Sequence, residues 1–212
     1  MKKGKLIALE GIDGAGTTTQ SWLLVQALKR RDISALGTWE PTGGPIGLLI
    51  RKFLRREIKP CSPEAMALLF AADRADHSDD LIKAAIRADN VVVCDRYVWS
   101  SIAYQSVVLD DLDWVLRINA RAEMPDLVVY VRVSPEVAKE RRVARDNRQD
   151  LYDDDKIQVA VAKSYDDMAK SGMCGCQVLV VDGEQNEDQV YSDILFGVEQ
   201  FLGITSEWRK KL

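Results

Sequence analysis

Short, almost continuously apolar runs recur along the chain, separated by longer segments in which apolar residues repeat with helical spacing. Such runs are typical of parallel strands that helices cover on both faces, because neither face needs polar residues. The alternation predicts βαβ units with right-handed crossovers, and therefore a five-stranded parallel sheet in a three-layer α/β/α sandwich. The strand candidates are Lys5 to Glu10, Ile33 to Trp39, Val91 to Asp95, Leu127 to Val133 and Gln177 to Asp182.

Two helix starts are clearly marked. Ser62-Pro63-Glu64 and Ser134-Pro135-Glu136 each offer a capping serine, a proline at the first helical position and a glutamate for the positive end of the dipole. From Arg141 to Asp155 the apolar period gives way to a charged run, which predicts a mobile flap over about residues 141–155. No repeat or linker divides the chain, so we expect one domain over residues 1–212.

A glycine-rich segment, Gly11 to Thr18, follows the first predicted strand and opens the helical pattern Thr19 to Arg30. In this context glycines let backbone N–H groups converge on phosphate oxygens, as in a P-loop, and the hydroxyl of Thr18 can hold Mg²⁺. The motif's lysine is missing, because Thr17 stands at its position. A neutral hydroxyl cannot offset charge between the β- and γ-phosphates. An ordinary strand-to-helix connection therefore also explains this segment taken alone.

Composition narrows the class of protein. Hydrophobic residues make up 47% and charged residues 29% of the chain, and no apolar run approaches the ~20 residues that span a bilayer. The net charge of −4 argues against general nucleic-acid binding, which requires a basic face. Four cysteines and one histidine make neither a disulfide scaffold nor a good zinc set. We expect a soluble cytoplasmic protein without a membrane or nucleic-acid partner.

Three further segments carry chemistry that suits a phosphorylated acceptor. Glu40-Pro41-Thr42-Gly43-Gly44-Pro45 follows the second strand and by itself predicts only a turn. Phe70 and Arg74 lie four residues apart on one helix face, an arrangement that a core phenylalanine and a solvated arginine would also explain. Asp95 to Gln105 begins at the end of a strand, where α/β sheets bind ligands. Its arginine fork matches phosphate geometry, and its side-chain amide can recognise an imide edge.

Taken with the glycine-rich loop, these segments resemble the thymidylate kinase family in order and spacing, from Leu6 to about Gly203. The resemblance implies a P-loop NTPase fold with a short charged lid, and Mg²⁺-dependent transfer of the ATP γ-phosphate to dTMP, giving dTDP for dTTP synthesis. It also implies that Arg96 grips the acceptor phosphate and that Phe70 stacks on thymine, while Arg74 meets base and phosphate. The implied dTMP-binding residues are Asp13, Glu40, Phe70, Arg74, Arg96, Ser100, Tyr104 and Gln105.

The donor side follows from the same resemblance. Thr18 and Asp95 are implied to support Mg²⁺, and Asp13 to face the acceptor sugar or the hydrated metal. The charged run resembles the family's lid, whose arginines in many bacterial members approach the transferred phosphoryl group. The implied ATP-binding residues are Gly11, Asp13, Gly14, Ala15, Gly16, Thr17, Thr18 and Thr19. The implied catalytic residues are Arg96, Asp13, Arg145 and Arg148, with Arg141 and Arg142 as further candidates in the lid.

Two departures from the family pattern leave other functions open. Thr17 replaces the lysine, and Trp39 stands where many members have arginine. An uncompensated loss of one strong donor costs on the order of 10²–10³ in rate. Besides a dTMP kinase, the chain therefore fits a kinase for another pyrimidine monophosphate, or a nucleotide-binding protein that has lost transfer activity. By resemblance we also expect a homodimer.

Overall fold

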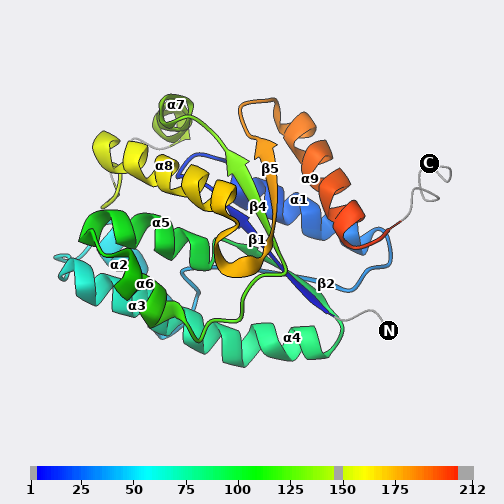
Figure 1. Cartoon of the computed structure of the whole chain (residues 1–212), viewed down its shortest axis with the longest axis horizontal. Coiled ribbons are helices and arrows are strands. Elements are labelled where there is room, and N and C mark those ends of the chain that lie inside the picture. The colour runs from blue at the N-terminus through cyan, green and yellow to red at the C-terminus, as the bar shows by residue number, and fades with distance from the viewer. Residues whose placement is uncertain (1–3, 146–149, 205–212) are drawn as a thin grey trace.

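The computed structural model (Figure 1) describes residues 4–145 and 150–204, the side chains of Arg145 and Cys174 excepted. Within these residues the strands form one parallel sheet in the order β2-β3-β1-β4-β5, which confirms the predicted sheet. β2 begins at Ala35 instead of Ile33, and β4 ends at Arg132 instead of Val133. The strands are β1 Lys5–Glu10, β2 Ala35–Trp39, β3 Val91–Asp95, β4 Leu127–Arg132 and β5 Gln177–Asp182.

Helices cover both faces of the sheet and complete the three layers (Figure 1). α1 and α9 pack together on one face, and α5 and α8 pack together on the other. α3 and α6 pack against α5, and α2 packs against α3. The helices are α1 Thr17–Lys29, α2 Pro45–Leu54, α3 Pro63–His77, α4 Lys83–Arg87, α5 Val98–Leu109, α6 Leu112–Asn119, α7 Pro135–Arg145, α8 Asp155–Ser171 and α9 Glu187–Phe201. Ser78–Ile82 is π-helical, and Met173–Gly175 is a 3-10 turn.

The helix starts follow from local chemistry. Ser62 caps α3, since its Oγ accepts a hydrogen bond from the backbone N–H of Ala65 at 3.2 Å. Pro135 opens α7 with Ser134 in front of it, so both predicted starts are confirmed. α1 begins at Thr17, two residues before the predicted Thr19, because its first turn is polar and carries no apolar period. Among the described residues, no helix is long and apolar enough to cross a membrane.

The order of the strands fixes where a ligand can bind. β1 is the central strand, and the chain crosses from β3 on one side of it to β4 on the other. Loops that leave the carboxyl ends of β1 and β3 therefore diverge, which opens a crevice at the edge where α/β sheets bind ligands. The register aligns Leu9, Trp39 and Asp95 across β1, β2 and β3, so the segments that follow these three strands start side by side.

The predicted flap of residues 141–155 is helical at both of its ends. Residues 141–145 complete α7, and α8 begins at Asp155. Arg148 lies outside the described residues. Beyond that gap, the N–H of Leu151 donates to the carbonyl of Leu54 at 2.9 Å, and Tyr152 is buried. The chain after the gap is thus held against the body of the protein by an apolar anchor inside the charged run.

Candidate active site

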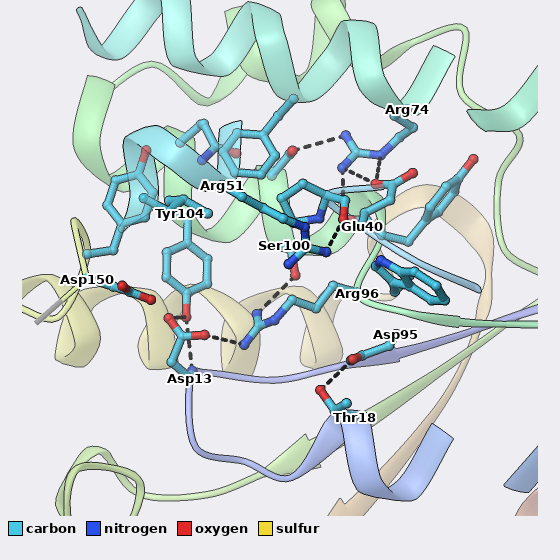
Figure 2. Close-up of a pocket in the computed structure, with 18 residues that line it drawn as sticks. Asp13, Thr18, Glu40, Arg51, Arg74, Asp95, Arg96, Ser100, Tyr104 and Asp150 are labelled. Carbon is cyan, nitrogen blue, oxygen red and sulfur yellow. Dashed lines mark hydrogen bonds and ion pairs between the residues drawn. The ribbon is translucent and has the colours of Figure 1, made fainter. Parts of the chain in front are cut away.

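A cavity of about 430 Å³ opens at the carboxyl ends of β1, β2 and β3 (Figure 2). Its walls come from the glycine-rich loop, α2, α3, α5 and the segment before α8. All eight residues that the sequence assigns to dTMP line it, as do both residues assigned to Mg²⁺. The assigned residues in its lining are Asp13, Thr18, Glu40, Phe70, Arg74, Asp95, Arg96, Ser100, Tyr104 and Gln105. These residues come from four separate segments of the chain, which therefore converge on one cavity.

The glycine-rich loop has the backbone of a phosphate-binding loop. Gly14 and Gly16 have φ of 98° and 92°, in the left-handed region that favours glycine. A Cβ on Gly14 would lie 2.5 Å from the carbonyl oxygen of Ala138, so α7 packs directly on the loop. Gly16 precedes the first residue of α1, and the N–H groups of a helix's first turn lack intrahelical partners and can bind an anion. Thr17, at the lysine position, is 4% exposed, whereas Thr18 is exposed and lines the cavity.

Arg96 is held between the loop and α5 (Figure 2). Its Nη1 donates to the carbonyl of Gly11 at 2.8 Å, and its Nη2 donates to Oδ1 of Asp13 at 2.7 Å. The backbone of Arg96 has φ 64°, an unusual conformation for a residue with a side chain. Burial works to lower the pKa of Arg96, but Asp13 and other acidic neighbours raise it well above its ordinary value. The strained turn thus presents a permanent cation to the cavity.

A carboxylate that no motif marks supports this turn. Glu10, the last residue of β1, is completely buried. Its Oε1 accepts from the N–H of Tyr97 at 2.9 Å, and its Oε2 accepts from Ser100 Oγ at 2.7 Å and Tyr165 Oη at 3.0 Å. Burial raises the pKa of Glu10 above its ordinary value. The one available signal in the sequence is a charged residue at the end of an otherwise apolar strand.

Arg74 forms part of the wall of the cavity. It is 1% exposed, and all three of its nitrogens are engaged within the protein. Glu40, the main partner, accepts from Arg74 Nε at 2.9 Å and lies 2.7 Å from Nη2, and its other oxygen is 3.0 Å from Nδ1 of His77. The remaining acceptors of Arg74 are Ser101 Oγ, Asn119 Oδ1 and the carbonyl of Tyr97. The geometry does not support the expectation that Arg74 reaches the acceptor phosphate, because a contact there requires it to give up an internal one.

Arg51, which belongs to no motif, is the third arginine of the cavity. It comes from α2 and lines the cavity, where it donates to the carbonyl of Pro41. Burial, with a smaller contribution from Arg55, lowers the pKa of Arg51. Asp73 and Asp95 act in the opposite direction on this pKa, and the hydrogen bond of Arg51 goes to a carbonyl. Among the lining residues that the structure describes, Arg51 and Arg96 are thus less fully engaged within the protein than Arg74.

The opposite end of the cavity offers oxygen ligands. Thr18 Oγ1 donates to Oδ2 of Asp95 at 2.5 Å (Figure 2). The other oxygen of Asp95 is buried and has no hydrogen-bond partner among the described residues. A hydroxyl and a carboxylate suit Mg²⁺, which commonly takes one or two protein oxygens and completes its shell with water and phosphate. The described residues contain no cluster of three or more His, Cys, Asp or Glu that could hold a metal.

Aromatic rings line the part of the cavity that the sequence assigns to thymine, together with one side-chain amide. Phe70 and Tyr104 line it, and the ring of Tyr152 packs on Tyr104 with a centroid separation of 5.6 Å. Gln105 is 3% exposed, and its Oε1 has no partner among the described residues. A buried unpaired oxygen costs about 1–3 kcal/mol, so Gln105 is set to accept a hydrogen bond from a ligand.

The structure describes only some of the arginine side chains that the sequence assigns to the lid. Arg148 lies outside the described residues, and the side chain of Arg145 is not described. Arg142 contacts the loop directly, since its Nη1 donates to the carbonyl of Asp13 at 2.7 Å. The fourth lid arginine, Arg141, is half-buried on α7.

Comparison with known proteins gives a consistent result. The family model described as thymidylate kinase matches residues 9–194. A probable thymidylate kinase of Pyrococcus horikoshii is 36% identical over 207 residues, covering 95% of this chain and all of the relative. One of Methanococcus aeolicus is 42% identical over 161 residues, covering 76% of this chain and 77% of the relative. A thymidylate kinase of Desulfotalea psychrophila is 33% identical over 199 residues, covering 94% and 96%. The chain belongs to the thymidylate kinase family.

Proposed function

We propose that this chain is a dTMP kinase that transfers the γ-phosphate of ATP to dTMP. The observation that carries the proposal is the convergence of the eight implied acceptor residues on one cavity beside a phosphate loop. Relatives that bear the name thymidylate kinase and cover nearly the whole chain support it. The proposal treats residues 1–212 as one kinase domain.

On the acceptor side, Arg96 and Arg51 hold the phosphate of dTMP. Both line the cavity, and a guanidinium fork fits a phosphate with two parallel hydrogen bonds. Phe70 provides a face for the thymine ring, and Gln105 Oε1 accepts the hydrogen bond of the imide N–H. Glu40 and Arg74 act as the wall that sets the shape of this pocket.

On the donor side, the amides of the loop from Gly11 to Thr19 bind the phosphates of ATP. Thr18 and Asp95 support Mg²⁺, which when bound neutralises charge on the phosphates and helps to orient them. The acceptor phosphate is already an anion and needs no strong base, so the protein's task is positioning and charge neutralisation. Asp13 fixes Arg96 and faces the acceptor sugar. Arg145 and Arg148 stay candidates for the transferred phosphoryl group.

The proposal includes a homodimer in the cytoplasm. Leu48 on α2, Leu68 on α3 and Leu112 on α6 are exposed, and these helices pack beside one another in one part of the molecule (Figure 1). A cluster of exposed leucines on packed helices supports an interface between copies. The free thiols of Cys61 and Cys94 fit a reducing compartment.

The proposal predicts a preference among acceptors. With ATP and Mg²⁺, kcat/KM for dTMP should exceed that for dUMP by roughly tenfold, because the pocket loses contact with one methyl group. It should exceed that for dCMP by roughly 10–100-fold, since the ring nitrogen of cytosine cannot donate to Gln105 Oε1. Steady-state ADP release measures each value, with an acceptor-free reaction as the blank. Equal rates with dTMP, dCMP and UMP would contradict the assignment of the base pocket.

A further inference from the structure

A tyrosine of α8 completes the hydrogen bonding behind the arginine that faces the cavity. Arg96 donates to Asp13 on one side, and on the other its Nη1 donates to Ser100 Oγ at 3.3 Å (Figure 2). Ser100 Oγ donates in turn to Oε2 of Glu10 at 2.7 Å. Tyr165 Oη lies 2.9 Å from Ser100 Oγ and donates to the same oxygen of Glu10 at 3.0 Å. One continuous hydrogen-bond network thus runs from the cavity into the core.

The protons of this network have a consistent arrangement. The proton of Ser100 is used in the bond to Glu10, so its lone pairs are open to Arg96. Burial, and next the charge of Glu10, raise the pKa of Tyr165 well above its ordinary value, so its hydroxyl stays a donor. Burial also raises the pKa of Glu10, whereas Ser100, Arg96 and Tyr165 work in the opposite direction. Tyr165 therefore helps to maintain the carboxylate that orients Ser100.

The place of Tyr165 on α8 connects this network to a wall of the cavity. The buried face of α8 carries both Gln158 and Tyr165, about two helical turns apart. Gln158 Nε2 donates to the carbonyl of Tyr152 at 2.9 Å, and the ring of Tyr152 packs on Tyr104 in the lining of the cavity. One helix therefore supports an aromatic wall and the arginine of the phosphate end together.

We propose that Tyr165 is a positioning residue for the acceptor phosphate, acting through Glu10 and Ser100 to hold Arg96 in its binding orientation. The inference rests on the proposed function, because it concerns how dTMP is held. Tyr165 is 0% exposed and lies outside the lining of the cavity, so it acts without touching the substrate. A guanidinium that is already oriented loses less side-chain freedom when a phosphate binds, and its affinity for the phosphate rises.

The test compares a ligand that carries the phosphate with one that lacks it. Tyr165→Phe keeps the buried ring and should weaken dTMP binding about tenfold, because a hydrogen bond to a charged group is lost behind Arg96. Thymidine binding should change by less than about twofold, since thymidine offers Arg96 no phosphate. Calorimetry measures dTMP directly and thymidine by its displacement of dTMP, so neither value needs turnover. A general loosening of the fold would weaken both ligands alike.

Tyr130→Phe is the matched control. The ring of Tyr130 stacks on that of Tyr165 with a centroid separation of 5.4 Å, but its hydroxyl donates to Asp166 and not to Glu10. This variant should change dTMP affinity by less than about twofold, because it leaves the network intact. A second comparison adds Tyr165→Phe to Arg96→Met. There it should no longer weaken dTMP binding, because the residue through which Tyr165 acts is gone.

Three results would each overturn the proposal. Tyr165→Phe could keep wild-type dTMP affinity, it could weaken dTMP and thymidine equally, or its effect could persist in full without Arg96. Failure of the proposed function has a different signature. A wild type that binds dTMP without forming dTDP would overturn the proposed transfer and leave this comparison readable, whereas a wild type that does not bind dTMP would overturn both.

Discussion

Replacement of Arg96 by methionine should lower kcat/KM for dTMP by roughly 10²- to 10³-fold, because it removes a strong charged donor from the phosphate end of the cavity. Arg96 joins the loop carbonyl of Gly11 to the carboxylate of Asp13 and presents its charge to the cavity. Its loss removes the phosphate's guanidinium and leaves Asp13 facing the acceptor as an unpaired anion. Methionine preserves much of the aliphatic bulk. The values come from initial rates at varied dTMP.

Binding of MgADP shows whether Arg96→Met affects only the acceptor site. MgADP affinity should change by less than about threefold in Arg96→Met, since the donor phosphates bind mainly to loop amides. Arg96→Lys keeps the charge without the fork and should recover only part of the activity. A kcat/KM for dTMP within threefold of wild type would remove Arg96 from the phosphate site.

The second large effect is on stability. Glu40→Gln should lower the free energy of unfolding by about 3–5 kcal/mol, because it leaves the cation of Arg74 buried without its carboxylate. Burial works to lower the pKa of Arg74, but Glu40 and Tyr97 raise it, so the arginine stays charged. Urea titration followed by circular dichroism measures the change.

Two control variants test whether this loss of stability comes from the buried ion pair. Asp79→Asn breaks an exposed pair with Lys83 on the protein surface and should leave the midpoint of the urea titration nearly unchanged. The double variant Glu40→Leu, Arg74→Leu should be less destabilised than Glu40→Gln alone, because it leaves no unpaired charge. If Glu40→Gln costs less than about 1 kcal/mol, the pair does not hold the wall of the cavity.

The sequence predicts the sheet well for a physical reason. β1, β3 and β4 are covered on both faces, so their residues are apolar almost without interruption and the runs stand out. β2 lies at an edge with an alternating burial pattern, and its start is therefore displaced. The charged run hides the continuation of α7, because charged residues are good helix formers and leave no apolar signal.

Within the candidate site, the sequence predicts those residues that belong to a recognisable motif. Arg96 and the P-loop glycines follow strands directly, so their place at the edge of the sheet can be inferred from order alone. Arg51 lies on a helix with no recognisable motif, and its position depends on how α2 packs. That Arg74 is already engaged by Glu40 is a three-dimensional fact, since the two residues lie 34 positions apart.

The central claim is that a member of this family without the P-loop lysine still transfers phosphate to dTMP. The most direct measurement incubates the wild-type protein with ATP labelled at the γ-phosphate, Mg²⁺ and dTMP, and follows labelled dTDP by chromatography, with Thr17→Lys alongside. We predict labelled dTDP from the wild type at a rate within about tenfold of Thr17→Lys, because the loop amides, Mg²⁺ and the arginines of the cavity together offset the charge of the phosphates. No dTDP from the wild type, with steady formation by Thr17→Lys, would contradict the claim and leave a nucleotide-binding protein that has lost the reaction.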